Sequence, residues 1–339
     1  MVMAEQKKLV ETEHLKTYFP IKRKILDYVA RKPQKYVKAV DDISIEVYEN
    51  EILGLVGESG CGKSTLARTI LRLNDPTDGK IEFNGTDITH MSNKELKPMR
   101  RNMQMVFQDP YSSLDPRVTI GDMLKTELLY HNLCKPEQVH QRILDILTEV
   151  GMDEEATKRY PSEFSGGQRQ RIAIARALAV DPQLVIADEP VSALDVSIQA
   201  QILNLLKVLR KDHNLTILFI THDLSVVRHI SDRICVMYLG KVVELGETED
   251  VFNQRLHPYT DILLRSAPSL DPRNRAKKAL IEGNPPSPID LPPGCRFNPR
   301  CPYATEECRT TEPELKDVGN KHWVACYHYQ DHSNVKLTL

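Results

Sequence analysis

The segment Gly57–Thr65, which reads GESGCGKST, constrains the fold of this chain more than any other stretch. It fits the pattern of a glycine, four residues and Gly-Lys-Ser/Thr, in which the backbone amides of a tight turn point at phosphate groups. Ile52–Val56 before it is an apolar run of strand length, and Lys63–Leu73 after it has the periodicity of a helix. A strand, a glycine turn and a helix N-terminus in this order predict an anion site in an α/β fold.

Length and composition narrow the class of protein. The 339 residues suit one large nucleotide-binding domain with an appendage. A formal charge of −2 and a pI near 6.6 do not predict a nucleic-acid-binding protein. The apolar runs are strand-sized and too short to span a bilayer. The polar segment Met1–His14 does not resemble a secretory signal, so we expect the chain in a reducing compartment, where clustered cysteines indicate a metal site.

Several segments around the loop predict strands and helices. Strand patterns cover residues 9–19, 37–48, 79–85 and 104–108, while helical spacing covers residues 119–131 and 136–151. The leucines and other apolar residues of these two helices are expected to pack together as a small helical lobe: Leu124, Leu128, Leu129, Ile143, Leu144, Leu147 and Val150. Residues 21–36 are basic and lack strand patterning, which favours a solvated loop over a surface for a membrane or partner. Tyr18, Phe19 and Tyr36 are candidates for stacking on a base.

Two further stretches carry polar groups that suit phosphate chemistry. Ser165-Gly166-Gly167-Gln168 opens a helix with a serine cap, which predicts a second anion-binding helix N-terminus. The apolar strand from Gln183 to Ala187 ends in the adjacent carboxylates Asp188 and Glu189. An aspartate at a strand end suits Mg²⁺, and the following glutamate can act on a water as general base.

Taken together, these motifs resemble ATP-binding-cassette (ABC) ATPases over residues 9–255. The motifs occur in the order of that family: the phosphate loop, Gln108, Ser165–Gln168, Asp188-Glu189, the Ser192–Asp195 segment and Thr221-His222. Phe164 stands where the family often has leucine. The resemblance implies a P-loop NTPase of the ABC type, with a mixed sheet core and an inserted helical subdomain.

The resemblance also implies a role for each motif. The loop residues would hold the ATP phosphates, with Ser64 and Asp188 on Mg²⁺, Gln108 sensing the metal and the attacking water, Glu189 activating that water and His222 contacting the γ-phosphate. Ser165–Gln168 and Asp195 would serve the nucleotide of a second ATPase subunit, so that two chains sandwich two nucleotides. The loop residues concerned are Gly57, Glu58, Ser59, Gly60, Cys61, Gly62, Lys63, Ser64 and Thr65.

The C-terminal part resembles the extension of oligopeptide and dipeptide importer ATPases. The resemblance rests on His257-Pro258-Tyr259-Thr260 and on the proline-rich linker from Pro285 to Pro293. Beyond the linker, four cysteines indicate a structural metal site that stabilises a small, loop-rich tail: Cys295, Cys301, Cys308 and Cys326. Four thiolates suit zinc or an iron–sulfur cluster; the Cys301-Pro302 step favours iron–sulfur, and the resemblance implies a [4Fe–4S] cluster.

We therefore predict an ATPase domain at residues 1–255, with its helical subdomain at roughly 110–180, a helix and linker at 256–294, and a metal-binding extension at 295–339.

The resemblance implies a peripheral subunit on the cytoplasmic side of the inner membrane. Its partners would be a second, paralogous ATPase, two transmembrane permeases and an extracytoplasmic peptide-binding protein. Import of another small solute, such as nickel or a glutathione-like molecule, and a soluble non-transport ABC ATPase are the alternatives. A cysteine tail that gates the ATPase as a redox or iron sensor is a third hypothesis, and it is compatible with peptide import.

Overall fold

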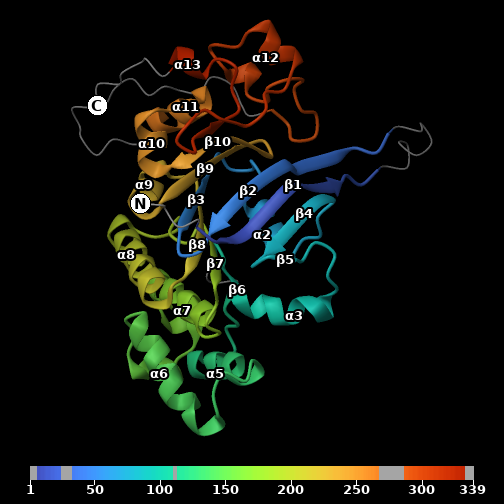
Figure 1. Ribbon diagram of the computed structural model, residues 1–339. Helices are drawn as coiled ribbons and strands as arrows, with labels where there is room; N and C mark the ends of the chain where they lie inside the picture. The colour runs from blue at the N-terminus through green and yellow to red at the C-terminus, as the bar shows by residue number, and fades with distance from the viewer. Residues whose placement is uncertain (1–5, 24–32, 110–112, 267–285, 333–339) are drawn as a thin grey trace. The chain divides into compact units, whose positions relative to one another are not determined.

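The computed structural model describes residues 6–23, 33–109, 113–266 and 286–332 (Figure 1). These residues form two compact units, each made of several chain segments. Within the described residues, the first comprises residues 6–9, 47–52, 90–109 and 113–220, and the second comprises residues 10–23, 33–46, 53–89, 221–266 and 286–332. Among the described residues, no helix combines the length and the apolar character needed to cross a membrane. Most of the basic segment 21–36 and part of the linker lie outside the described residues.

The first unit combines parallel strands with a group of helices (Figure 1). Its strands are ordered β6-β7-β8, and both neighbouring pairs are parallel. Its elements are α3 (Asn93–Asn102), β6 (Met103–Val106), α5 (Ile120–Tyr130), α6 (Val139–Glu149), α7 (Gly166–Leu178), β7 (Leu184–Asp188), α8 (Val196–His213) and β8 (Thr216–Thr221), with short 3-10 turns at Pro136–Gln138, Glu154–Lys158 and Pro161–Glu163. Strands β7 and β8 are buried along their whole length, as expected for continuous apolar runs in a covered parallel sheet.

Helices α5 and α6 pack against each other and form the expected helical lobe (Figure 1). Their apolar residues at three- and four-residue spacing face inward, and Leu124, Leu128 and Leu147 are at most 1% exposed. Leu129 is 36% exposed instead, because it follows Leu128 by one position and therefore points about 100° away around the helix. The prediction that all these leucines pack inside the lobe is wrong at Leu129.

The second unit contains two sheets. The first has the order β2-β1-β4-β5, and the other strands of this unit are ordered β11-β12-β10-β9-β3. The β3–β9 pair is parallel and the β9–β10 pair is antiparallel, so the sheet is mixed. The elements are β1 (Lys8–Pro20), β2 (Tyr36–Tyr48), β3 (Ile52–Val56), α2 (Lys63–Ile70), β4 (Asp78–Phe83), β5 (Thr86–Asp87), α9 (Leu224–Ile230), β9 (Arg233–Tyr238), β10 (Lys241–Glu247), α10 (Thr248–Asn253), α11 (Pro258–Ser266), α12 (Glu306–Thr310), β11 (Lys316–Asp317), β12 (Trp323–Val324) and α13 (Tyr329–His332), with a 3-10 turn at Asn298–Arg300.

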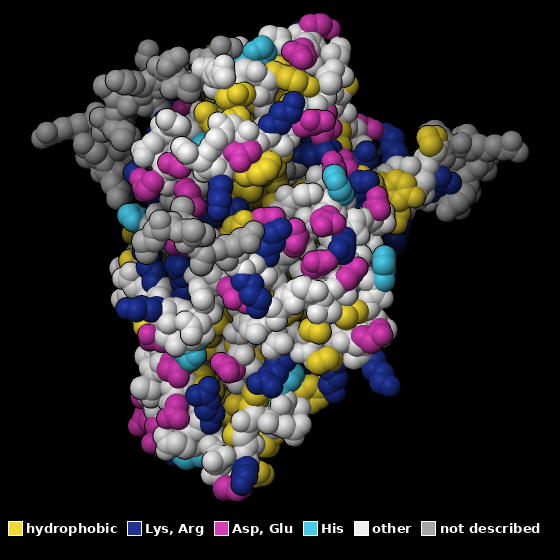
Figure 2. All heavy atoms as spheres, in the orientation of Figure 1, with side chains coloured by type: hydrophobic (Ala, Val, Ile, Leu, Met, Phe, Trp, Pro, Cys, Tyr) yellow, Lys and Arg dark blue, Asp and Glu magenta, His cyan; other side chains and the backbone are white. Residues whose placement is uncertain are grey.

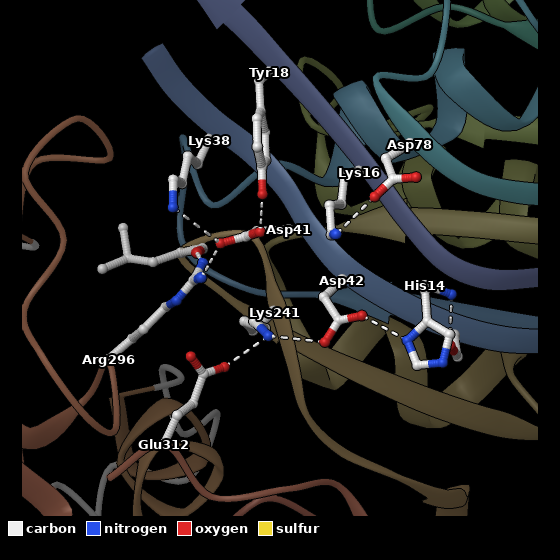
Figure 3. Close-up of polar contacts among 12 residues, drawn as sticks. His14, Lys16, Tyr18, Lys38, Asp41, Asp42, Asp78, Lys241, Arg296 and Glu312 are labelled. Atoms are coloured by element: carbon white, nitrogen blue, oxygen red, sulfur yellow. Dashed lines mark hydrogen bonds and ion pairs between the residues drawn. The ribbon is translucent and has the colours of Figure 1, made fainter. Parts of the chain in front are cut away.

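The C-terminal segment is built into this second unit through buried groups. Strand β12 pairs with β10, so residues beyond the linker extend the same sheet. The buried Arg296 donates to the carboxylate of Asp41 on β2 and to the carbonyl of Leu239 (Figure 3). Asp41 also accepts a hydrogen bond from the hydroxyl of Tyr18 on β1. Segments from both ends of the chain therefore meet at one carboxylate.

A second, more exposed group of charges lies beside it (Figure 3). Lys241 Nζ contacts Asp42 Oδ2 at 3.3 Å and Glu312 Oε1 at 2.6 Å, and His14 Nδ1 lies 2.7 Å from Asp42 Oδ1. Positive and negative side chains are also interspersed on the molecular face drawn in Figure 2, as expected for a net charge of −2. Exposed pairs of this kind add little to stability, so the buried Arg296 contact is the stronger attachment.

Candidate functional site

The phosphate loop has the expected strand, turn and helix. Strand β3 ends at Val56 and α2 begins at Lys63, as predicted, although the helix ends at Ile70 because Arg72 adopts a φ of 53°. Gly62 caps the helix with a φ of 108°, and a Cβ there would lie 2.0 Å from the carbonyl oxygen of Ala39. Only glycine fits this position, since both the backbone conformation and the close approach exclude a side chain.

The ammonium of Lys63 lies within the curve of this loop. Its Nζ donates to the carbonyl oxygen of Gly57 at 2.7 Å and to that of Glu58 at 3.0 Å. The thiol of Cys61 lies 3.8 Å from the same nitrogen, and burial raises the pKa of Cys61, so the thiol stays neutral. Lys63 is thus held by carbonyls of the loop itself, at the place where phosphate oxygens would compete for it.

In the first unit, the structure brings Gln108 and Glu189 together. The amide Nε2 of Gln108 donates to Glu189 Oε2 at 2.8 Å. Both residues follow the carboxyl ends of neighbouring parallel strands, because Val106 of β6 is paired with Ala187 of β7. Polar residues at such strand ends face the ligand crevice of an α/β sheet.

Glu189 adopts an unusual backbone conformation. Its φ is 46°, in the left-handed region that residues with a side chain rarely enter. Its N–H donates to the carbonyl oxygen of Ile220 at 2.9 Å, and this bond fixes the turn that follows β7. Strained backbone held in this way is frequent at functional sites. Asp188, the last residue of β7, is 2% exposed.

The start of α7 has the predicted serine cap. Ser165 Oγ accepts from the N–H of Gln168 at 3.3 Å, and Gln168 Oε1 accepts from the N–H of Ser165 at 3.0 Å. A Cβ on Gly167 would lie 2.6 Å from Ile198 Cγ2, so this glycine allows α7 and α8 to approach. The first-turn amides of a helix have no partner within the helix, and they are therefore suited to an anion.

The remaining site residues occupy element ends. Asp195 is exposed at the N-cap of α8, and its side chain makes no capping hydrogen bond. His222 is exposed and directly follows β8. Ser64 and Asp188, which the sequence predicts as Mg²⁺ ligands, offer the oxygen atoms that this ion prefers. Among the described residues no group of three or more His, Cys, Asp or Glu side chains could hold a metal ion. This is compatible with Mg²⁺, which is commonly bound by one or two protein ligands together with phosphates.

The three aromatic candidates for base stacking differ in their surroundings. The hydroxyl of Tyr18 is bonded to Asp41, and Lys38 Nζ lies 5.5 Å from the centre of the Tyr18 ring. Phe19 and Tyr36 are 41% and 42% exposed. Base stacking by any of the three stays a prediction.

The four C-terminal cysteines line one pocket. Cys295, Cys301, Cys308 and Cys326 surround it together with His257 and Phe297, and Cys308 is buried. Burial raises the pKa of Cys295 to about 11 and that of Cys326 to about 12. As described, the four thiols are not arranged as ligands of one ion. Metal binding at this pocket would have to release their protons and draw the sulfurs together.

Two residues that contact the phosphate loop are not among the site residues predicted from the sequence. Arg300 Nη1 and Nη2 lie 2.8 and 2.9 Å from the carboxylate oxygens of Glu58, and the hydroxyl of Tyr259 accepts from the N–H of Glu58 at 2.8 Å. Tyr259 belongs to a motif that was informative only through a resemblance, and nothing in the spacing around Arg300 indicates a partner 242 positions away.

Family models match two parts of the chain. The model described as ABC transporter matches residues 40–192, and the one described as the C-terminal region of oligopeptide/dipeptide transporters matches residues 243–308.

Curated proteins are similar over nearly the whole length. The oligopeptide transport ATP-binding protein AppF of Bacillus subtilis (strain 168) is 48% identical, with 97% of this chain and 100% of that protein covered. OppF of Escherichia coli (strain K12), also an oligopeptide transport ATP-binding protein, is 48% identical over 95% of this chain and 96% of that protein. The dipeptide transport ATP-binding protein DppF of Haemophilus influenzae (strain ATCC 51907 / DSM 11121 / KW20 / Rd) is 44% identical over 96% of this chain and 98% of that protein.

Among solved structures, the dimeric post-hydrolysis state of the ATP-binding cassette MJ0796 bound to ADP and Pi is similar with a TM-score of 0.62 and 28% identity. The match covers 70% of this chain and 98% of that one. A dimeric MJ0796 cassette is similar with a TM-score of 0.61 and 27% identity, over 70% of this chain and 98% of that one.

Proposed function

Because the chain belongs to the oligopeptide and dipeptide transport ATP-binding proteins of the ABC transporter family, we propose that it hydrolyses ATP to power peptide uptake through separate membrane permeases. The observation that carries this function is similarity over nearly the full length of transport ATP-binding proteins. The C-terminal match at residues 243–308 favours peptide importers over ABC ATPases that lack this region.

Individual residues then take defined roles. Lys63 and the loop amides bind the phosphates, and this lysine exchanges its bonds to loop carbonyls for bonds to phosphate oxygens. Ser64 and Asp188 would hold Mg²⁺, which when bound would neutralise charge that develops on the phosphates. Glu189 accepts a proton from the attacking water, and Gln108 orients this carboxylate through its 2.8 Å hydrogen bond. His222 donates to the γ-phosphate.

The phosphate role of the loop is tested by Lys63→Ala. Loss of a charge-assisted bond to the phosphates is expected to weaken Mg-ATP binding about tenfold or more. Calorimetric titration of the full-length chain measures this affinity. Lys80→Ala, which removes a half-exposed lysine of β4, is the matched control and should bind Mg-ATP as the unmodified chain does. Unchanged binding by Lys63→Ala would show that the nucleotide lies elsewhere.

The assembly we propose is a head-to-tail pair of ATPase subunits on the cytoplasmic side of the inner membrane. The capped helix at Ser165–Gln168, together with Asp195, binds the nucleotide held by the other subunit, which is a paralogue. The dimeric state of the similar MJ0796 cassette supports a paired arrangement. Two permeases and an extracytoplasmic peptide-binding protein complete the importer. Co-purification with the permeases, followed by a peptide-binding assay on the delivery protein, tests the assembly and separates peptides from other small solutes.

We also propose that the four C-terminal cysteines hold a [4Fe–4S] cluster. Their shared pocket supports this site, because cluster ligands must converge on one cavity. A zinc ion is the alternative occupant, since four thiolates suit either metal.

Replacing one of these cysteines is expected to remove the metal. Anaerobically purified chain should be brown, and Cys308→Ser should lose the visible absorbance and most of its iron. Cys134→Ser, at an isolated half-buried cysteine, is the control and should stay brown. A colourless chain that contains stoichiometric zinc would contradict the cluster. If Cys308→Ser loses the absorbance but keeps full coupled transport, the cluster does not gate the ATPase.

A further inference from the structure

We infer that Arg300 is a positioning residue that sets the conformation and charge of the phosphate loop through Glu58. Arg300 lies in the 3-10 turn Asn298–Arg300 of the C-terminal segment, and Glu58 is the second residue of the loop. Their contact is bidentate: Nη1 lies 2.8 Å from Oε2, and Nη2 lies 2.9 Å from Oε1. Paired bonds of this geometry fix both the position and the orientation of the carboxylate.

The guanidinium is held rigidly in this position. The side chain of Arg300 is 5% exposed, and its Nη1 also donates to the hydroxyl of Tyr238 at 3.2 Å. Tyr238 packs against Tyr259 and Phe297, with ring centres 4.6 and 5.3 Å apart. All three residues are at most 1% exposed, so Arg300 packs against aromatic side chains of the hydrophobic core. A contact made from rigid, buried groups is preorganised before any ligand binds.

Glu58 is fixed at three points by three different residues. Arg300 holds the carboxylate, Tyr259 accepts the backbone N–H at 2.8 Å, and Lys63 donates to the carbonyl oxygen at 3.0 Å. The first two of these residues belong to the C-terminal part of the chain. The loop conformation at Glu58 is therefore determined by groups that lie more than 200 positions away as well as by the loop itself.

The charge of Glu58 gives this contact a functional consequence. A carboxylate in a phosphate-binding loop repels the phosphates, and the repulsion grows with the charge of the nucleotide. Arg300 offsets this charge and keeps the carboxylate turned toward the aromatic cluster. Without Arg300, Glu58 is an uncompensated anion in the loop. The affinity for ATP should then fall more than the affinity for ADP, because ATP carries one more phosphate. This inference rests on the proposed role of the loop as the phosphate site.

The experiment compares the affinities of the full-length chain for Mg-ATP and Mg-ADP by calorimetry. Arg300→Met keeps most of the packing volume but removes the charge, and it is expected to weaken Mg-ATP binding about tenfold. Mg-ADP binding should weaken less. Arg300→Lys should recover part of the affinity, since it restores the charge without the bidentate geometry. Arg309→Met, at a more exposed arginine of the same segment, is the matched control and should leave both affinities unchanged.

The double variant Glu58→Gln/Arg300→Met separates positioning from mere structural support. Because it removes the uncompensated carboxylate, its affinity for Mg-ATP should return to within about twofold of the unmodified chain. Glu58→Gln alone leaves the Arg300 cation unpaired beside the loop, so it should bind Mg-ATP more tightly than the unmodified chain, and it remains informative even if Arg300→Met does not fold. Equal losses for ATP and ADP, or a double variant as weak as Arg300→Met, would overturn the inference. Lys63→Ala decides separately whether the loop is the phosphate site at all.

Discussion

Glu189→Gln is expected to lower the rate of ATP hydrolysis about a hundredfold to ten-thousandfold, the usual contribution of a general base. The amide has nearly the same shape as the carboxylate and can still accept the hydrogen bond from Gln108, which measures 2.8 Å in the structure. It cannot accept a proton from water. Phosphate release by the assembled transporter measures the rate, while calorimetry on the chain should show unchanged affinity for Mg-ATP.

Such a variant should also accumulate as an ATP-bound dimer. Hydrolysis would normally reopen the pair, so blocking it traps the closed state. Size-exclusion chromatography with ATP or ADP distinguishes the two states. Glu155→Gln, at an exposed glutamate of the same unit, is the control and should hydrolyse ATP normally. Undiminished turnover in Glu189→Gln would reject Glu189 as the base.

Arg296→Met is expected to destabilise the chain by about 3–5 kcal/mol, the usual cost of removing one partner from a buried ion pair. Arg296 is 7% exposed and Asp41 is 8% exposed, so the carboxylate left behind cannot be hydrated fully. The carbonyl of Leu239 loses the same donor. Burial alone would raise the pKa of Asp41. The hydrogen bond from Tyr18 and the charge of Arg296 nevertheless keep this pKa below its ordinary value. Asp41 therefore stays charged at neutral pH and needs its partner.

Urea unfolding followed by circular dichroism measures this loss of stability. Lys35→Met breaks the ion pair between Lys35 and Asp290, whose side chains are 59% and 69% exposed, and should shift stability by less than about 0.5 kcal/mol. The double variant Asp41→Asn/Arg296→Met should recover part of the loss, because no buried charge remains unpaired. An unfolding midpoint in Arg296→Met equal to that of Lys35→Met would contradict the structural role given to this contact.

The sequence predicted features that depend on a few adjacent residues. The strand at Ile52–Val56, the helix start at Lys63 and the cap at Ser165 are all confirmed, because glycine conformations, apolar runs and caps are local properties. The end of α2 was predicted three residues too late, since nothing local indicated the left-handed conformation of Arg72. Residues 9–19 lie within β1, as predicted, but the pairing of β1 with β4 is irregular between Glu13 and Lys16, where His14 adopts a φ of 48°.

Contacts between distant segments could not be predicted in the same way. Arg296 and Asp41 are 255 positions apart, and Arg300 and Glu58 are 242 apart. An isolated arginine in a loop belongs to no periodic pattern or spacing that would identify the residue it contacts. Most exposed charges also pair only weakly. Only the packing of the C-terminal segment on the sheet shows which arginines are buried. The roles of the catalytic and metal-binding residues, and the domain boundaries, stay predictions.

The attachment of the C-terminal segment has a consequence for how the protein is made. Translation produces Glu58 of the phosphate loop 201 residues before Tyr259 and 242 residues before Arg300. A nascent or truncated chain that stops before residue 296 has the complete GESGCGKST motif but lacks the two guanidinium groups that hold the Glu58 carboxylate and offset the charge of Asp41. We therefore expect the loop to reach the conformation seen in the structure only after Arg300 has been synthesised.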